Sequence, residues 1–305
     1  MKIAVIDLGT NTCNLLVAEI NSTEYHILHQ SKQLVRLGDN KIKSNEISPE
    51  ATQRVLESFF KHQEIIEDFK VDKIRAIATS AVRSAANRIE FLEQIGEKTG
   101  YVVKVVSGEK EAELIFNGVL LAFQDFADPA VILDIGGGSN EIILVKDNEI
   151  IWKESRPTGM ARVINQFEIS DPILPSETET IRNYFSAQHK NAFEESLSEN
   201  VKTLIGCSGA FDTIADIIDK VAPGKKQRIT QKISTGDFYN VYDKIIHSTR
   251  DERLCMKGMD MVRVDLIVPA VILIEKLISG AQIENIIQTD FALREGVLFE
   301  MMNKD

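Results

Sequence analysis

The chain has 305 residues, of which 44% are hydrophobic and 27% charged, and its formal net charge is −11 at pH 7. This length and apolar content allow sizeable buried cores and predict two domains. The acidic balance argues against a nucleic-acid partner or a membrane surface, since both are anionic. A site for a phosphate-rich substrate therefore has to be locally positive or assisted by a metal ion.

The cysteines and the apolar runs indicate where the protein works. Cys13, Cys207 and Cys255 share no CxxC spacing, which supports neither a disulfide framework nor a zinc site. The first strand meets an acid too early for a signal peptide. The longest apolar run, residues 266–274, contains a proline and is much shorter than the ~20 residues of a membrane helix. We expect a cytoplasmic protein.

The N-terminal segment predicts a strand, a tight turn and a second strand. Apolar residues 3–6 run into the sequence DLGTNT at residues 7–12, and apolar residues 15–18 follow. Residues 25–37 are predicted to be a third extended segment, which residues 38–40 (GDN) end with a turn.

Strands and helices then alternate. Ser48-Pro49-Glu50 predicts a helix start, and the helix should reach about residue 69. This helix is followed by a strand at 73–78 and a loop at 79–83. Next come a helix at 87–99, which Gly100 ends, and a strand at 102–106. Such alternation predicts parallel strands whose loops gather at one edge of the sheet. Arg83 and the next loop, SGEKE at 107–111, should therefore converge on the Asp7 turn. Glu111 would lie in the first turn of the next helix.

The second half repeats the strand–turn–strand pattern of the N-terminal segment. Residues 124–129, polar with a proline, mark the predicted boundary, and LDIGGGSNE at 133–141 predicts a strand, a glycine turn and a strand. Backbone amides of such a turn can form a nest for a phosphate, and Asp134 and Glu141 at its ends suit a hard cation. A glycine-rich hairpin that binds nothing is the alternative. Asp7 and Asp134 lie 134 − 7 = 127 residues apart. This interval suggests two similar half-domains, a pattern that resembles the actin-like and sugar-kinase phosphotransfer fold.

The remainder continues the alternation. A turn at 157–160 precedes a helix to about residue 167, and residues 170–200 are predicted to be mostly helical, with no function assigned. A strand at 203–205 leads through GCSG at 206–209 into a helix whose N-terminus offers further amides. The chain continues with a basic loop at 221–232 and a helix capped by Ser234. It ends with an apolar helix at 265–279, a strand at 285–289 and a helix at 292–302. The last helix could pack on the first half.

Several of these segments together resemble one protein family over nearly the whole chain. The segments are DLGTNT (7–12), SGEKEA (107–112), DIGGGSNE (134–141), ESR (154–156) with Gly159, Ser208-Gly209 and LREG (293–296). They are similar to the exopolyphosphatase and guanosine-pentaphosphate phosphohydrolase (Ppx/GppA) family in its short, two-domain form. The resemblance implies two ribonuclease-H-like domains of the actin-like ATPase superfamily flanking a cleft. It also implies hydrolysis of terminal phosphoanhydrides with Mg²⁺ or another divalent cation.

The resemblance assigns roles to residues of this sequence. Glu111 matches the catalytic glutamate and Arg83 the arginine that grips phosphate. The implied metal ligands are Asp134, Glu141 and Asp7. The implied phosphate-binding residues are Gly9, Thr10, Asn11, Gly136, Gly137, Gly138, Ser139, Ser208 and Gly209. The expected domains are residues 1–124, with the helix 292–305 packed back on them, and residues 125–291.

The sequence departs from the family pattern at a few positions. Thr10 and Thr12 replace the usual serines but keep the hydroxyl group. Asn140 replaces a threonine, which leaves the local hydrogen bonding open, and Pro269-Ala270 stands where glycine is common. Long members continue into an HD-type helical domain after the point where this sequence ends, so we expect processive binding of long polyphosphate to be affected.

Three classes of function stay open at this point. The first is a phosphohydrolase of polyphosphate or of pppGpp, acting as a monomer or a homodimer. The second is an ATPase or kinase of the actin-like fold, and the third a phosphate-binding sensor without catalysis. Glu111 could instead be only a helix-start acid, Arg83 a salt-bridge partner, and Asp7 and Asp134 turn residues. The five histidines form no HExxH or similar spacing, which argues against metal binding by them.

Overall fold

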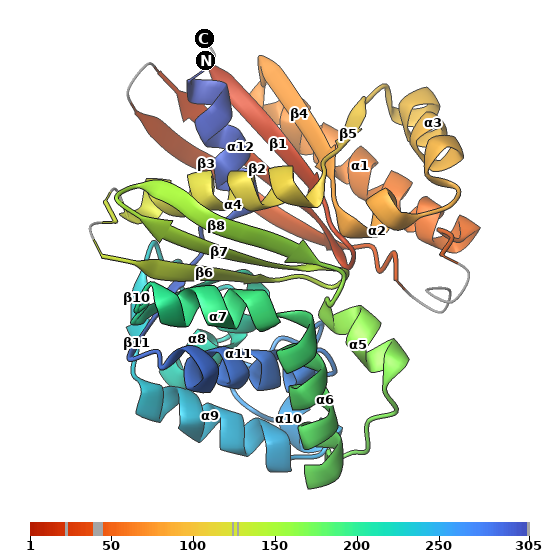
Figure 1. Ribbon diagram of the computed structural model, residues 1–305. Coiled ribbons are helices and arrows are strands. Elements are labelled where there is room, and N and C mark those ends of the chain that lie inside the picture. The colour runs from red at the N-terminus through yellow and green to blue at the C-terminus, as the bar shows by residue number, and fades with distance from the viewer. Residues whose placement is uncertain (22–23, 39–44, 124, 127, 304–305) are drawn as a thin grey trace. The chain divides into compact units, whose positions relative to one another are not determined.

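The computed structural model describes all residues except 22–23, 39–44, 124, 127 and 304–305 (Figure 1). It divides into two compact units. Unit 1 comprises residues 1–118 and 293–305, and unit 2 comprises residues 119–292. The predicted turn at 38–40 lies partly outside the described residues. The division expected between residues 124 and 125, and the cleft, stay predictions.

Unit 1 is built on a five-stranded sheet in the order β3-β2-β1-β4-β5. The first three strands form an antiparallel meander, whereas β1, β4 and β5 run parallel. This is the strand order of a ribonuclease-H-like fold, so the predicted fold class is confirmed for this unit. The strands are β1 Lys2–Leu8, β2 Thr12–Ile20, β3 Tyr25–Leu34, β4 Lys73–Ala78 and β5 Val103–Val105.

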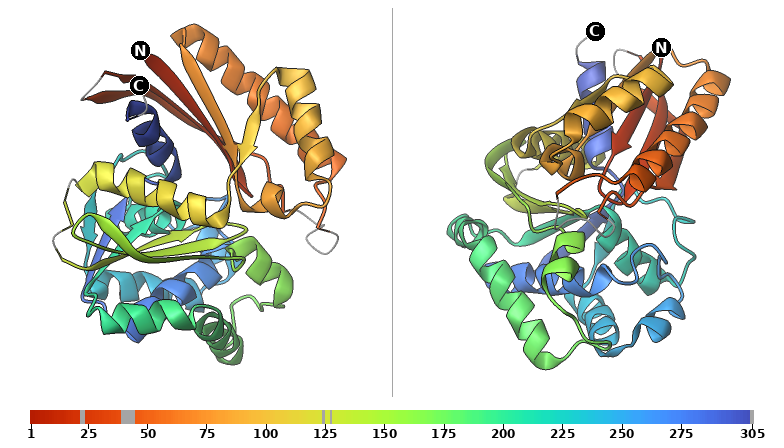
Figure 2. Two further views of the ribbon diagram at one scale, coloured as in Figure 1. Left: turned by 45° about the horizontal axis from the view of Figure 1, so that its top comes forward. Right: turned by 90° about the vertical axis from the view of Figure 1, so that its right-hand side faces the viewer.

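The helices of unit 1 begin and end largely where local chemistry predicts. The Ser48 hydroxyl accepts a hydrogen bond from the Ala51 amide at the start of α1, and Gly100 ends α3 in the left-handed conformation. The loop predicted at 79–83 is wrong, because residues 80–84 form a short helix. Figure 2 shows α1 and α3 together on one side of the strands. The helices are α1 Pro49–Phe69, α2 Ser80–Ser84, α3 Arg88–Thr99, α4 Gly108–Phe123, whose last turn belongs to unit 2, and α12 Leu293–Met302.

The chain returns to unit 1 at its end, where α12 contacts β1 and β2. A Cβ atom at Gly296 would lie 1.7 Å from the backbone oxygen of Leu114 in α4. Only glycine therefore lets these two helices approach so closely.

Unit 2 contains a six-stranded sheet in the order β10-β11-β9-β6-β7-β8. Strands β6, β9 and β11 run parallel, and β7, β8 and β10 run antiparallel to their neighbours. The short strand β10 was missed, because its residues were assigned to a loop. The strands are β6 Ala130–Ile135, β7 Asn140–Lys146, β8 Glu149–Arg156, β9 Thr203–Cys207, β10 Gln231–Ile233 and β11 Asn285–Thr289.

The helices of unit 2 gather around α11. This helix is buried along nearly its whole length and contacts α5, α6, α7, α8 and α9. The prediction that residues 170–200 are mostly helical is confirmed by α6 and α7. Among the described residues, no helix is both long and apolar enough to cross a bilayer. The helices are α5 Met160–Gln166, α6 Pro175–Gln188, α7 Lys190–Ser198, α8 Gly209–Asp219, α9 Thr235–His247, α10 Arg250–Leu254 and α11 Ile267–Ala281.

The two units share one design, as the repeated sequence pattern predicts. The order β3-β2-β1-β4-β5 in unit 1 matches β8-β7-β6-β9-β11 in unit 2. The first turn is closed by a 2.9 Å bond from the Gly9 amide to the Thr12 oxygen, and the second by a 3.0 Å bond from Gly136 to Ser139. The donor and the acceptor of the second bond each lie 127 residues after those of the first, since 136 − 9 = 127 and 139 − 12 = 127.

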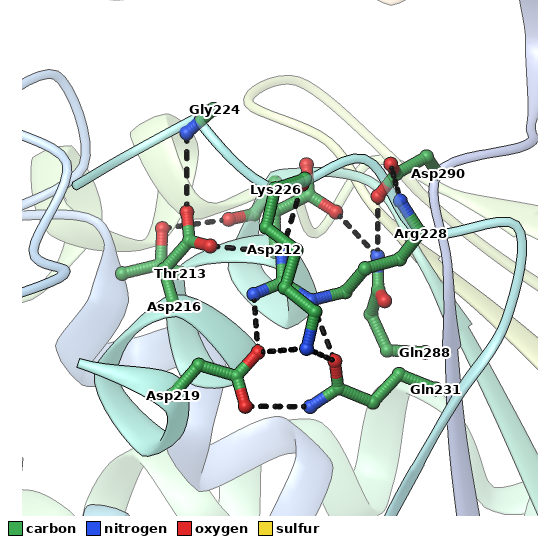
Figure 3. A network of polar contacts seen from close by, with 11 residues as sticks. Asp212, Thr213, Asp216, Asp219, Gly224, Lys226, Arg228, Gln231, Gln288 and Asp290 are labelled. Carbon is green, nitrogen blue, oxygen red and sulfur yellow. Dashed lines mark hydrogen bonds and ion pairs between the residues drawn. The ribbon is translucent and has the colours of Figure 1, made fainter. Parts of the chain in front are cut away.

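A buried arginine anchors the basic loop of unit 2 (Figure 3). The Arg228 side chain is 3% exposed and pairs with Asp216 at 2.8 Å and Asp219 at 2.7 Å. Its Nε donates to the Gln231 side chain on β10, and its backbone amide donates to Asp290, just after β11. These bonds fix the loop to α8 and to the edge of the sheet.

Candidate active site

The carboxyl ends of the parallel strands of unit 1 bring three loops together. Asp7 stands near the end of β1, and Thr79, which follows β4, donates its amide to the Leu8 oxygen at 3.2 Å. Val106, which follows β5, donates to the Ala78 oxygen at 3.0 Å. Because these strands are neighbours in the sheet, α2 and α4 both start at this edge.

The two residues expected to act on a substrate form an ion pair there. Arg83, at the end of α2, donates from Nη1 to Glu111 Oε2 at 2.7 Å and to the Val106 oxygen at 3.0 Å. The Glu111 side chain is 8% exposed and that of Arg83 24%. Both described bonds come from one nitrogen of a group that carries five N–H donors. The guanidinium can therefore hold Glu111 and still face an anion.

The surroundings of Glu111 shift its proton affinity. Burial raises the pKa of the Glu111 carboxyl to about 7, although the Arg83 charge and hydrogen bonds from Arg83 and Thr79 act in the opposite direction. The negative charge of Asp7 also raises this pKa. A carboxyl group of this kind can take up and release a proton near neutral pH.

Asp7 combines burial with an open oxygen atom. Its Oδ2 accepts a hydrogen bond from Asn14 Nδ2 at 3.0 Å, whereas its buried Oδ1 has no hydrogen-bond partner among the described residues. Burial raises its pKa, Glu295 adds to this rise, and Asn14 and Arg294 counteract it. A buried carboxylate oxygen without a donor is available to a cation. Thr79, Arg294 and Glu295 also act on these carboxyl groups, and the sequence pattern did not mark them as site residues.

The rest of the first turn is fixed through its carbonyl groups. The Asn11 oxygen accepts from the amides of Val35 and Arg36, and the Thr10 oxygen from Leu37. Thr10 is buried, and Gly9 closes the turn. The backbone after β3 therefore holds the segment expected to bind phosphate.

In unit 2, the glycine turn is oriented by the start of α5. The carbonyl oxygens of Gly136 and Gly137 accept from the amides of Met160 and Ala161 at 3.0 and 2.9 Å, and that of Gly138 from Arg162 Nε at 2.9 Å. In a trans peptide the C=O and the following N–H point in opposite directions. The amides of residues 137–139 therefore point away from α5, in the arrangement that an anion nest requires.

Gly159 makes this packing possible. A Cβ atom at Gly159 would lie 2.4 Å from the backbone carbon of Gly137 and 2.4 Å from the nitrogen of Gly138. Any other residue would push the turn away from α5. The close approach of the turn to α5 therefore explains on steric grounds why residue 159 is glycine.

The two acidic residues of the second hairpin face each other. Asp134 and Glu141 are directly paired across β6 and β7, which places their side chains on the same face of the sheet. Glu141 is buried and accepts a bond from Ser155 Oγ at 2.7 Å. The described residues contain no group of three or more His, Cys, Asp or Glu side chains that could hold a metal ion. Two facing carboxylates suit Mg²⁺, which keeps several of its waters.

The start of α8 holds Ser208 and Gly209, whose phosphate-binding role stays a prediction. The Ser208 hydroxyl bonds to both the amide and the oxygen of Ile135, at 3.2 and 3.1 Å, so it ties the loop to β6. At Gly209, the position of a Cβ atom is taken by the guanidinium of Arg263, 1.4 Å away. Arg263 in turn pairs with Asp260 at 2.9 Å. The Ser208 hydroxyl has one proton, so donating it to phosphate would require its bond to the Ile135 oxygen to break.

Comparisons with known proteins identify the family. The model of the Ppx/GppA phosphatase family matches residues 16–305. The crystal structure of an exopolyphosphatase from Cytophaga hutchinsonii ATCC 33406 is similar with a TM-score of 0.94 and 35% identity, covering 99% of this chain and 98% of that one.

Two curated proteins show the range of names among the relatives. Exopolyphosphatase 2 of Mycobacterium tuberculosis (strain CDC 1551 / Oshkosh) is 28% identical over 286 residues, which cover 90% of this chain and 89% of that protein. A guanosine-5'-triphosphate,3'-diphosphate pyrophosphatase of Photobacterium profundum is 27% identical over 307 residues, covering 99% of this chain and 59% of that protein. With a family model that matches nearly its whole length, this chain belongs to the Ppx/GppA phosphatase family.

Proposed function

We propose that the protein hydrolyses terminal phosphoanhydride bonds and that inorganic polyphosphate is its substrate. The observation that carries this proposal is the Arg83–Glu111 pair, which lies at the strand edge next to Asp7. It supplies a carboxyl group that exchanges its proton near neutral pH and a fixed cation beside it. Hydrolysis of a phosphoanhydride needs both a group that orients water and positive charge around the phosphoryl oxygens.

Glu111 is the proposed general base. Its position in the first turn of α4 places it at the positive end of the helix dipole, which favours the carboxylate form. In that form it can accept a proton from a water molecule that attacks the terminal phosphorus in line with the leaving oxygen. The same carboxylate orients Arg83 through the 2.7 Å bond.

Arg83 and the glycine turn are the proposed phosphate ligands. A planar guanidinium can bind two phosphoryl oxygens at once, which the point charge of a lysine cannot reproduce. The amides of residues 137–139 point away from α5 and would donate to phosphate oxygens. Gly9, Thr10 and Asn11 are proposed to serve the same purpose in unit 1.

A divalent cation is the proposed cofactor, with Mg²⁺ as the first choice. Each unit offers its own carboxylate ligands: Asp134 and Glu141, paired across β6 and β7, in unit 2, and Asp7 in unit 1, whose Oδ1 has no hydrogen-bond partner among the described residues. When bound, the cation would neutralise negative charge on the phosphate chain. This assignment fits the donor chemistry, since all three groups are carboxylates.

The substrate choice rests on the names of the relatives. Two of the three relatives described above are exopolyphosphatases, and each match covers about nine-tenths or more of both chains. The pppGpp reading is favoured by one observation, the match to a guanosine-5'-triphosphate,3'-diphosphate pyrophosphatase over 99% of this chain. We therefore keep pppGpp as the second candidate substrate.

A phosphate-release screen tests the proposal. The purified protein is given polyphosphates of several lengths, pppGpp and ATP, with and without Mg²⁺. We expect Mg²⁺-dependent release from polyphosphate, loss of release in Glu111→Gln with binding retained, and little change in Glu109→Gln, whose exposed side chain lies in the same helical turn. Release from ATP alone would indicate an ATPase, release from pppGpp alone the second candidate, and equal turnover by Glu111→Gln would remove Glu111 from its role.

A further inference from the structure

A buried chain of polar side chains runs through unit 2 from β8 to the glycine turn. Its four central members, Asn140, Thr158, His189 and Glu154, are between 0% and 7% exposed. None of the metal or phosphate assignments above uses them. Buried polar groups are retained at a cost unless they are fully bonded, so a connected set of four calls for an explanation.

The contacts in this chain are short and continuous. Asn140 Nδ2 donates to the backbone oxygen of Thr158 at 2.7 Å and to its Oγ1 at 3.0 Å. Thr158 Oγ1 lies 2.9 Å from His189 Nε2, and His189 Nδ1 lies 2.6 Å from Glu154 Oε1. The other oxygen of Glu154 accepts from Arg156 Nε at 2.8 Å.

One order of donors satisfies these contacts. The Glu154 carboxylate can only accept, so Nδ1 of His189 carries the proton of that bond. In the neutral imidazole, Nε2 then accepts the Thr158 hydroxyl proton, and the threonine oxygen accepts from Asn140. His189 is thus held as one tautomer by Glu154, and it in turn fixes the rotation of the Thr158 hydroxyl.

Thr158 is adjacent to the part of the backbone that orients the glycine turn. Gly159 lies against Gly137 and Gly138, and the next two amides, of Met160 and Ala161, hold the carbonyl oxygens of Gly136 and Gly137. Asn140 extends the connection from the other side, because it directly follows Ser139 in the chain. The polar chain therefore fastens both ends of the structure that presents the turn's amides.

We propose that His189 and Glu154 are positioning residues for the phosphate-binding glycine turn, acting through Thr158 and Asn140. The proposal rests on the proposed function, in which this turn binds substrate phosphate. It assigns a role to the α6–α7 junction, which contains His189 and for which the sequence suggested none. These residues do not contact substrate themselves, so their loss should weaken phosphate binding more than it slows turnover.

The test compares two substitutions of Thr158 in the full chain. Thr158→Val removes the hydroxyl group and keeps the shape, whereas Thr158→Ser keeps the hydroxyl. We expect Thr158→Val to raise KM for tripolyphosphate by about tenfold, the effect of one lost hydrogen bond, with a smaller change in kcat, and Thr158→Ser to stay close to the parent. Thr178→Val is the control, because this buried threonine in α6 bonds only to the backbone oxygen of Leu174 among the described contacts.

Two further measurements test the positioning role independently of the proposed phosphohydrolase activity. Binding of tripolyphosphate to the same variants in a Glu111→Gln background, followed by calorimetry, tests the turn even if the parent releases no phosphate. The ¹⁵N chemical shifts of His189 should show a proton on Nδ1 and none on Nε2, and Glu154→Gln should change this pattern and weaken binding. The Glu154 variant also serves if Thr158→Val fails to fold.

Three outcomes would overturn the proposal. Thr158→Val could bind tripolyphosphate as tightly as Thr178→Val does. Thr158→Ser could lose as much affinity as Thr158→Val, which would point to packing alone. The ¹⁵N shifts could place the proton on Nε2. Absence of phosphate release by the parent, with intact differences in binding, would instead reject only the proposed function.

Discussion

Replacing Glu111 by glutamine tests the electrostatics of the candidate active site without requiring a substrate. Glutamine has the same shape but cannot ionise. Glu111 is almost fully buried beside Arg83 and Asp7, and its pKa of about 7 shows that burial outweighs the attraction of the arginine. The substitution should therefore change how the stability of the protein depends on pH.

The magnitude follows from the pKa values. Glu111 titrates at about 7 in the folded protein, compared with 4.5 for the ordinary side chain. At 1.36 kcal/mol for each whole step in pKa, the ionised carboxylate costs the folded state about 3 kcal/mol. This is a sizeable share of the 5–15 kcal/mol by which proteins are typically stable.

The sign and the pH window are fixed by the same two values. Below pH 4.5 the carboxyl group is protonated in both the folded and the unfolded state, so it costs nothing. Between pH 4.5 and about 7 the unfolded chain ionises while folded Glu111 keeps its proton, so the parent protein loses stability as the pH rises. Above about pH 7 the cost is complete. Relative to the parent, Glu111→Gln should become more stable by about 3 kcal/mol across this window.

Equilibrium urea denaturation at pH values from 5 to 8.5, followed by circular dichroism, measures the effect. Subtracting the parent curve from that of the variant cancels the titrating groups that do not interact with residue 111, and Asp7, which does, remains in the difference. Glu109→Gln is the matched control, since its exposed side chain lies in the same helical turn and should give a nearly flat difference. A flat difference for Glu111→Gln as well would refute the claim that burial controls this carboxyl group.

Three other predictions follow from the same contacts. The acid limb of kcat/KM for phosphate release should have an apparent pKa near 7 in the parent, because Glu111 acts as a base only when ionised; a limb near 4.5 would contradict this role. Gly159→Ala should lower phosphate release at least about tenfold and the free energy of unfolding by about 1–3 kcal/mol, because its Cβ would meet the glycine turn at 2.4 Å; unchanged activity would disprove that contact. Arg228→Met should cost about 3–5 kcal/mol in urea denaturation, because Asp216 stays buried without its partner, and a loss below about 1 kcal/mol would speak against this pairing.

The sequence predicts well those features that neighbouring residues decide. The Ser48 cap, the left-handed Gly100 and the two glycine hairpins each depend on a few adjacent residues, and the structure has them where the pattern indicates. The meeting of Arg83 and Glu111 was also predictable, because neighbouring parallel strands bring their following loops together.

Features made by distant partners escaped prediction. Strand β10 exists because Gln231–Ile233 pairs with β11, more than fifty residues later, and nothing in its own composition marks it as a strand. His189 is 31 residues from Thr158 and 35 from Glu154, so no local spacing reveals the contact. The bond between the Ser208 hydroxyl and Ile135, 73 residues away, could not be foreseen either. Each of these cases depends on tertiary packing.

The return of α12 to unit 1 has a consequence during protein synthesis. All of unit 2 is translated between the body of unit 1 and this helix, and at typical elongation rates that interval lasts roughly 10–30 s. Until α12 emerges, the strands β1 and β2 and the Leu114 backbone that it covers have nothing from this helix to shield them. The nascent chain thus contains an N-terminal unit that still lacks its last helix, while unit 2, which is contiguous in sequence, can already fold. This is the stage at which a chaperone would find apolar surface to bind.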